Sequence, residues 1–193
     1  MNQKYSRQEI LLKGIFLLRR QGYHHTGIND ILKECGIPKG SFYNFFKSKE
    51  EFGIQCLTLY GRSMLRLIQQ FTRDESLSPI ERLQSYFEVT IQANEEEGMQ
   101  YGCLLMNSAT ELAGYNDRFA ALSHQLFELW IEELGLCIEE GQETGEIIDS
   151  IPAKSLAAHL YSSFFGAFSR GKMTRSIKPL QQMLALNLDY IQQ

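Results

Sequence analysis

The sequence has few cysteines and no long hydrophobic run. No apolar stretch reaches the roughly 18 residues that a membrane-spanning helix needs, and charged residues occur throughout the first twenty positions. We therefore expect a cytoplasmic protein that makes no membrane contact. The four cysteines, Cys35, Cys56, Cys103 and Cys137, show no CxxC spacing. This scatter predicts neither a zinc site nor a disulfide framework, so we expect reduced thiols and no metal ion or other cofactor.

Motifs of common enzyme classes are also missing. The chain contains no glycine-rich phosphate-binding loop, no HExxH and no GxSxG, and no histidine stands beside an evident nucleophile. These absences argue against an enzyme. Two alternatives stay open: a thiol-dependent helical enzyme that pairs Cys103 with His124 or His159, and a helical interaction module whose basic end binds an acidic protein. Turnover of a thioester or an electrophile would identify the enzyme, and a failure to bind DNA would favour the module.

Charge is distributed unevenly along the chain. Residues 1–50 hold nine Lys/Arg and four Asp/Glu, a net charge of +5, whereas the remaining 143 residues carry −9, so that the whole chain carries −4. A basic N-terminal segment on an acidic body is typical of a protein whose N-terminal segment alone meets a polyanion.

The hydrophobic pattern is helical almost everywhere, since strand-type alternation never persists. Glycines, prolines and capping boxes divide the chain into segments. We expect an all-α protein of about nine helices: one ending near Gly22, then segments at about 26–36, 38–47, 48–74, 78–98, 102–113, 116–142, 152–170 and 176–192. The second and third helices, joined by a glycine turn, form a helix-turn-helix pattern within a small N-terminal bundle, which precedes a larger one.

Residues 36–52, GIPKGSFYNFFKSKEEF, combine phenylalanines and lysines in a way that neither a core segment nor an ordinary surface segment requires. Phe42 and Phe46 are one helical turn apart and are expected to face inward. Tyr43 and Asn44 then project outward, and Gly40 permits close approach of another backbone. Polar groups suited to phosphate surround them, namely Lys39, Ser41, Lys47 and Lys49. The segment therefore predicts a recognition helix that reads DNA in the major groove.

The longer stretch TGINDILKECGIPKGSFYNFFKSKEEF resembles the DNA-binding signature of TetR-family transcriptional regulators, with a close match over about residues 6–55. The resemblance implies contacts with double-stranded DNA by Thr26, Gly27, Lys39, Gly40, Ser41, Tyr43, Asn44 and Lys49. Two positions depart from the family pattern. Gly27 stands where a second threonine is common and Phe45 where tyrosine is common, which puts in doubt one phosphate hydrogen bond and removes one phenolic contact.

The same resemblance implies an organisation for the whole chain. It predicts a helix-turn-helix DNA-binding domain at 1–48 and a ligand-sensing and dimerisation domain at 49–193. A homodimer, joined through residues 152–192, would bind a palindromic operator as a repressor and respond to a small-molecule effector. The alternative is that these last helices only close the core of the monomer. Among the aromatic residues of the body, Trp130, Tyr161 and Phe165 are candidates for the effector pocket.

Two further segments indicate the kind of effector. YGCLLMNSATELA at 101–113 places Cys103 near a helix start, where the helix dipole favours a thiolate. With FFGAFSRGKMTRSIKPL at 164–180, it resembles the TetR-family branch that senses electrophiles such as N-ethylmaleimide. That resemblance implies that Cys103 is the sensing thiol and that Lys172 supports it. The alternatives are a buried, unreactive Cys103 and a body that binds an apolar ligand reversibly.

Overall fold

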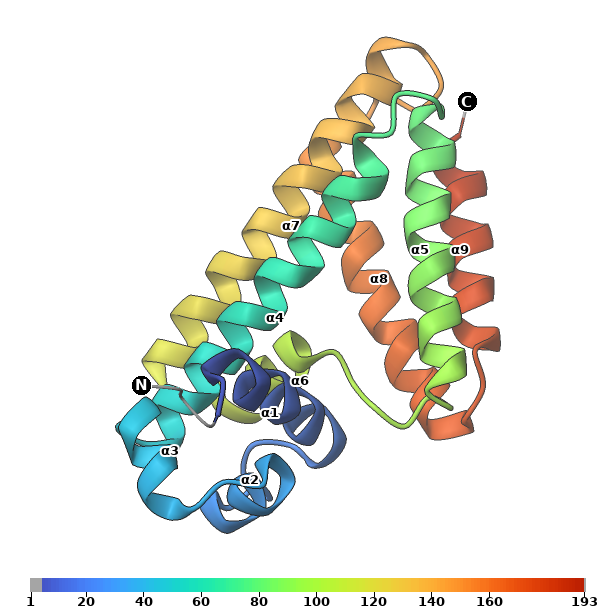
Figure 1. The fold of residues 1–193 in the computed structure, drawn as a ribbon. Helices are drawn as coiled ribbons and strands as arrows, with labels where there is room; N and C mark the ends of the chain where they lie inside the picture. Colours follow the sequence, from blue (N-terminus) through green and yellow to red (C-terminus); the bar gives the residue numbers. More distant parts are fainter. Residues whose placement is uncertain (1–4, 193) are drawn as a thin grey trace. The chain divides into compact units, whose positions relative to one another are not determined.

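The computed structural model describes residues 5–192, and this range is built from helices (Figure 1). They are α1 (Arg7–Gln21), α2 (Ile28–Cys35), α3 (Lys39–Phe45), α4 (Lys49–Thr72), α5 (Pro79–Glu96), α6 (Leu104–Leu112), α7 (Asp117–Glu143), α8 (Ala153–Thr174) and α9 (Lys178–Ile191). The all-α prediction is confirmed. No helix within residues 5–192 has the length and hydropathy needed to cross a membrane.

Glycines end the first two helices, as the sequence predicted. Gly22 follows α1 with a φ of 82°, and Gly36 follows α2 with a φ of 67°. These are backbone conformations that residues with a Cβ rarely adopt. Pro38 then stands immediately before α3, with extended backbone that directs the chain into the new helix.

Three phenylalanines form the centre of the N-terminal bundle. The ring centroids of Phe42, Phe46 and Phe52 lie 5.1 to 5.7 Å apart, and each side chain is at most 1% exposed. Gly14 of α1 makes room for this cluster, because a Cβ there would lie 2.2 Å from Cζ of Phe52. The start of α4 is thus packed into the same core as α1 and α3.

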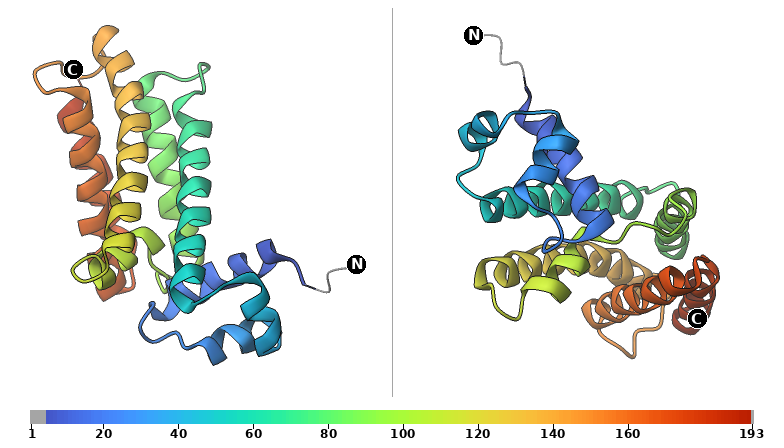
Figure 2. Two further views of the ribbon diagram at one scale, coloured as in Figure 1. Left: turned by 90° about the vertical axis from the view of Figure 1, so that its left-hand side faces the viewer. Right: turned by 90° about the horizontal axis from the view of Figure 1, so that it is seen from below.

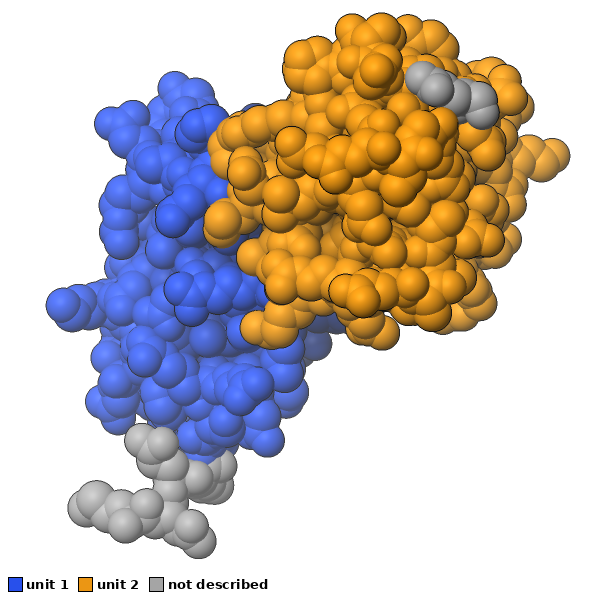
Figure 3. All heavy atoms as spheres, turned by 90° about the horizontal axis from the view of Figure 1, so that it is seen from above, with its two compact units in different colours: residues 1–63, 101–126 blue, residues 64–100, 127–193 orange. Residues whose placement is uncertain are grey.

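The chain divides into two compact units (Figure 3). The first contains residues 1–63 and 101–126, and the second contains 64–100 and 127–193. Helices α4 and α7 contribute to both units. In the first unit α1, α2 and α3 form a small cluster, drawn in blue shades in Figure 2. The boundary expected between residues 48 and 49 stays a prediction.

A buried arginine fixes the start of α5 in the second unit. The side chain of Arg82 is 5% exposed, and its Nη1 lies 2.6 Å from Oε2 of Glu140 on α7. Its Nε donates to the carbonyl groups of Asp74 and Leu77, each at 2.8 Å. Because a buried charge is costly unless it is paired and hydrogen-bonded, these contacts hold the turn between α4 and α5 against α7.

Helix α8 is longer than predicted. It continues to Thr174, whereas the sequence pattern predicted an end near residue 170, and Arg175 ends it with a φ of 49°. Gly171 lies within the helix, where its bare backbone serves packing: a Cβ there would lie 2.7 Å from Cε of Met99. Lys172 consequently lies within the helix, on its exposed side.

Candidate nucleic-acid interface and sensor site

Helix α3 presents two different faces. Phe42 is fully buried, whereas Tyr43 is 45% exposed and Asn44 is also exposed. Gly40 is exposed near the start of the helix, and a Cβ there would meet no atom within 4 Å. The fold itself therefore has no steric need for glycine at this position, and the bare backbone leaves space for an external partner.

The start of α4 follows the end of α3 closely in sequence, and Ser48 and Glu51 cap it. The N–H of Glu51 donates to Oγ of Ser48 at 3.1 Å, and the Glu51 carboxylate accepts from the N–H of Lys47 at 2.9 Å. The helix then begins at Lys49, whose Nζ lies 4.2 Å from the ring centroid of Tyr23. Partial burial lowers the pKa of Lys49, although Glu111 and Asp30 act in the opposite direction.

The two residues before α2 occupy different positions. Thr26 is completely buried, and its hydroxyl donates to the carbonyl of Gly22 at 2.6 Å. Gly27 is exposed, and its N–H donates to the Asp30 carboxylate at 2.7 Å. The Thr26 hydroxyl is thus occupied inside the fold, where it fixes the turn between α1 and α2. Participation of Thr26 in DNA binding stays a prediction.

The remaining residues that the sequence predicted to contact DNA lie on the surface of the first unit. Lys39 is exposed and Ser41 is half-buried. Together with the exposed part of α3 and the first turn of α4, they provide hydroxyl, amide and ammonium groups of the kinds that contact phosphates and base edges. This arrangement is the one expected of a recognition helix.

Cys103 is the N-cap residue of α6 and is half-buried. Burial raises the pKa of its thiol, and this effect outweighs the hydrogen bonds from the N–H groups of Met106 and Leu105, the Tyr60 hydroxyl and the nearby charge of Arg19. The expectation that the helix start makes the thiol acidic is therefore wrong for this state. The backbone N–H groups at the helix start do lower the thiol pKa, but desolvation of the thiolate is the larger effect.

The other three cysteines are buried, and each thiol faces a backbone carbonyl. Burial raises the pKa of Cys35 to about 11 and that of Cys137 to about 12, and it raises the pKa of Cys56 as well. These thiols are core residues.

Helix α6 and the residues before it contact α1. Nε of Arg19 donates to the carbonyl of Gly102 at 2.7 Å, and its guanidinium lies 5.6 Å from the ring centroid of Tyr101. The Phe16 ring packs on Tyr101 with a centroid distance of 4.5 Å. The residue next to Cys103 is thus attached directly to the N-terminal bundle.

The far end of α6 contacts the turn after α1. The carboxylate of Glu111 accepts hydrogen bonds from the N–H groups of Tyr23, at 2.8 Å, and His24. Tyr115 extends this contact, since its hydroxyl is hydrogen-bonded to the His24 ring. We call the contacts of Arg19 and Glu111 the α6 bracket. Sequence reasoning missed both residues, because their partners lie more than 80 positions away and no local pattern marks them.

The proposed pocket residues lie in the second unit. The ring of Tyr161 packs against Trp130 and Phe165, with centroid distances of 5.5 and 5.0 Å, and all three side chains are buried. The hydroxyl groups of Tyr161 and Tyr86 are 3.0 Å apart within this cluster. Lys172 belongs to the same unit, whereas Cys103 belongs to the other, so their pairing stays a prediction.

These features define a helix-turn-helix regulator with a separate helical body. The family described as "Bacterial regulatory proteins, tetR family" matches residues 10–53, and "Tetracyclin repressor-like, C-terminal domain" matches residues 79–186. The chain belongs to the TetR family of transcriptional regulators. The curated relatives and the family matches are regulators and not enzymes.

Two curated relatives are similar over most of their length. The chain is 37% identical to the HTH-type transcriptional repressor DhaR of Mycobacterium sp. (strain GP1), over 93% of this chain and 89% of DhaR. It is 26% identical to the HTH-type transcriptional repressor NemR of Escherichia coli (strain K12), over 93% and 90% of the two chains. The crystal structure of the reduced form of E. coli NemR matches with a TM-score of 0.88 and 26% identity, over 97% of this chain and 96% of that one.

Proposed function

We propose that this chain is a dimeric repressor that binds a palindromic operator and leaves it when an electrophile modifies Cys103. The observation that carries DNA binding is the two-faced α3, with phenylalanines in the core and Tyr43 and Asn44 on the surface. A helix of this length reads only a few base pairs, so two copies on two half-sites provide the specificity. Both named relatives are called repressors, which supports the direction of control.

The dimer would form through α8 and α9. These helices expose three large apolar side chains, Met173 at 82%, Leu186 at 71% and Tyr190 at 62%. Ser162 is exposed and Ala158 is half-buried on α8, so both small residues permit close approach of another helix. Exposed large apolar side chains on neighbouring helices are typical of an interface between copies.

A change at Cys103 would reach the DNA-binding bundle through the α6 bracket. The thiolate of Cys103 adds to the alkene of N-ethylmaleimide, which forms an S–C bond, and the resulting carbanion takes a proton from water. The adduct would sit beside Gly102, whose carbonyl accepts from Arg19. Displacement of that peptide would release one end of α6 from α1. About 1.4 kcal/mol of difference between two arrangements reduces DNA affinity tenfold.

The test of DNA binding is a gel shift with palindromic fragments from the region beside the gene. Wild type should shift one fragment at nanomolar concentration, and Tyr43→Phe should shift it more weakly. Leu129→Ala is a matched control, because Leu129 is 43% exposed on α7 and outside the proposed interface. No shift of any palindromic fragment by the folded wild type would contradict the proposal.

The tyrosine pair in the second unit supports a second candidate, a reversible effector pocket. Tyr86 and Tyr161 place two hydroxyl groups inside an aromatic cluster, which suits a small apolar ligand with one polar group. Mass spectrometry separates the possibilities. One covalent adduct per chain supports the sensor, release without an adduct supports the pocket, and repeated turnover would indicate the thiol-dependent enzyme.

A further inference from the structure

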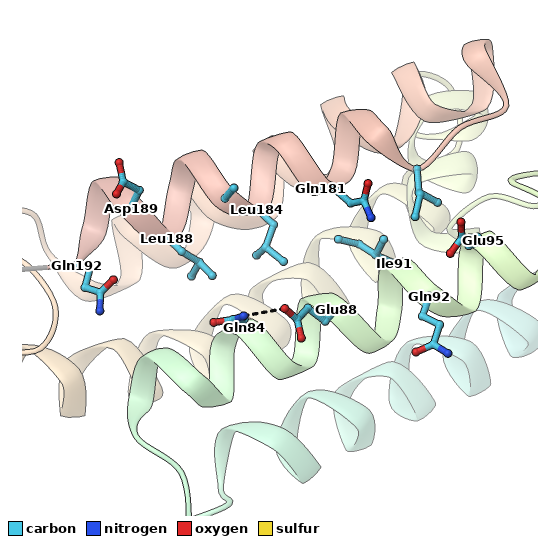
Figure 4. Close-up of a pocket in the computed structure, with 12 residues that line it drawn as sticks. Gln84, Glu88, Ile91, Gln92, Glu95, Gln181, Leu184, Leu188, Asp189 and Gln192 are labelled. Atoms are coloured by element: carbon cyan, nitrogen blue, oxygen red, sulfur yellow. Dashed lines mark hydrogen bonds between the residues drawn. The ribbon is translucent and has the colours of Figure 1, made fainter.

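A groove of about 630 Å³ runs between α5 and α9 in the second unit (Figure 4). The two helices lie antiparallel, and each contributes one stripe of side chains at helical spacing. The lining residues are Gln84, Glu88, Ile91, Gln92 and Glu95 from α5, Ile177 just before α9, Gln181, Leu184, Ala185, Leu188 and Asp189 from α9, and Gln192. Neither the DNA interface nor the sensor uses this groove.

The floor of the groove is apolar. Ile91, Leu184 and Leu188 are between 4% and 9% exposed, and Figure 4 shows Ile91 and Leu184 pointing into the space between the two helices. Only a small part of each side chain still faces water, and a ligand with an aliphatic or aromatic body would cover that part.

The walls carry negative charge and no positive charge. The lining includes the carboxylates of Glu88, Glu95 and Asp189, and it includes no lysine, arginine or histidine. Glu88 accepts a hydrogen bond from Nε2 of Gln84 at 2.7 Å. Within residues 5–192, none of the three carboxylates lies within ion-pair distance of a cationic side chain. An uncompensated carboxylate beside an apolar floor favours a ligand that brings its own cation.

The spacing of two carboxylates defines the shape of that ligand. Glu88 and Glu95 lie on one side of α5, two helical turns apart, about 10 Å along the axis. Ile91 lies between them, and Gln181 faces this section from α9 with an amide oxygen that can accept a hydrogen bond.

We propose that this groove binds a linear diammonium cation with an apolar chain between its two charges. One ammonium group pairs with Glu88 and the other with Glu95, while the connecting chain lies on Ile91 and Leu184. The volume falls in the range of small-molecule sites, about 300–1,000 Å³. The site is independent of DNA binding and of Cys103 chemistry.

The experiment titrates the full-length protein with 1,8-diaminooctane in a calorimeter at low salt, without DNA. Saturable binding is expected, and it should weaken as salt screens the exposed charges. Octylamine, which has one charge, should bind more weakly, and the neutral 1,8-octanediol should not bind measurably. Equal binding of the diol and the diamine would overturn the assignment of the carboxylates.

Three charge-neutralising variants locate the site. Glu88→Gln and Glu95→Gln should each weaken binding of 1,8-diaminooctane about two- to fivefold, as expected for exposed ion pairs. Glu96→Gln is the matched control, because Glu96 is exposed on the same helix but does not line the groove. A loss in Glu96→Gln equal to that in the other two would indicate nonspecific attraction and refute the site.

A fourth variant tests the groove without changing its charge. Ala185 is exposed and lines the groove, so Ala185→Phe should fill it and reduce binding at least as much as either charge change. Unchanged binding in Ala185→Phe, or no saturable binding by wild type up to about 10 mM, would overturn the proposal.

Discussion

The α6 bracket gives a quantitative prediction at Glu111. Its carboxylate accepts the N–H groups of both Tyr23 and His24, directly after Gly22, where α1 ends. Hydrogen bonds to a charged group contribute about 1.5–3 kcal/mol each when buried. Tyr23 N–H is partly buried, whereas the bond at His24 is exposed, so water can replace the second. Glu111→Ala should therefore reduce the local stability of this turn by about 1.5–3 kcal/mol.

Amide hydrogen exchange measures this loss directly. The amides of Tyr23 and His24 should exchange about 10- to 100-fold faster in Glu111→Ala than in wild type, since a tenfold change corresponds to about 1.4 kcal/mol. Glu139→Ala is the control, because Glu139 is exposed on α7. Unchanged protection at both amides would refute the structural role of Glu111. If the amides of Tyr23 and His24 exchanged equally fast in Glu139→Ala, the structural role of Glu111 would also be refuted.

Three further results are expected. Lys49→Ala should weaken operator binding and reduce the slope of log K against log salt by about one. Fluorescence anisotropy at several salt concentrations measures this slope, and an unchanged slope would exclude a phosphate contact. Ala158→Glu should lower the mass observed by sedimentation if α8 pairs with its copy, and a wild-type monomer at micromolar concentration would exclude the dimer. Because burial raises the pKa of Cys103, its alkylation rate should still increase with pH above the ordinary thiol pKa of about 8.5, and a plateau at neutral pH would contradict this.

Local signals predicted the helices well. Glycine at position 22 and at position 36, and the Ser48–Glu51 capping pair, act within a few residues, so the sequence alone revealed the ends of α1 and α2 and the start of α4. The inward and outward faces of α3 were predicted for the same reason, since helical spacing determines which side chains share a face.

Contacts between distant segments could not be predicted. Arg19 is 83 positions from Gly102, and nothing in the sequence near either residue indicates the hydrogen bond. The pKa of Cys103 was misjudged for a related reason. The helix start that favours the thiolate is a local feature, whereas the burial that opposes it depends on the fold around the sulfur. The end of α8 was also misplaced, since the helix continues through Gly171 to Thr174.

Release of operator DNA by N-ethylmaleimide is the direct test of Cys103 as the sensing thiol. A labelled operator bound by wild type should dissociate when the reagent is added, and the Cys103→Ser protein should bind the operator equally well. We expect Cys103→Ser to stay bound in the presence of the reagent, while Cys137→Ser, a change at a buried core thiol, still dissociates. Release of Cys103→Ser at the wild-type rate would contradict it.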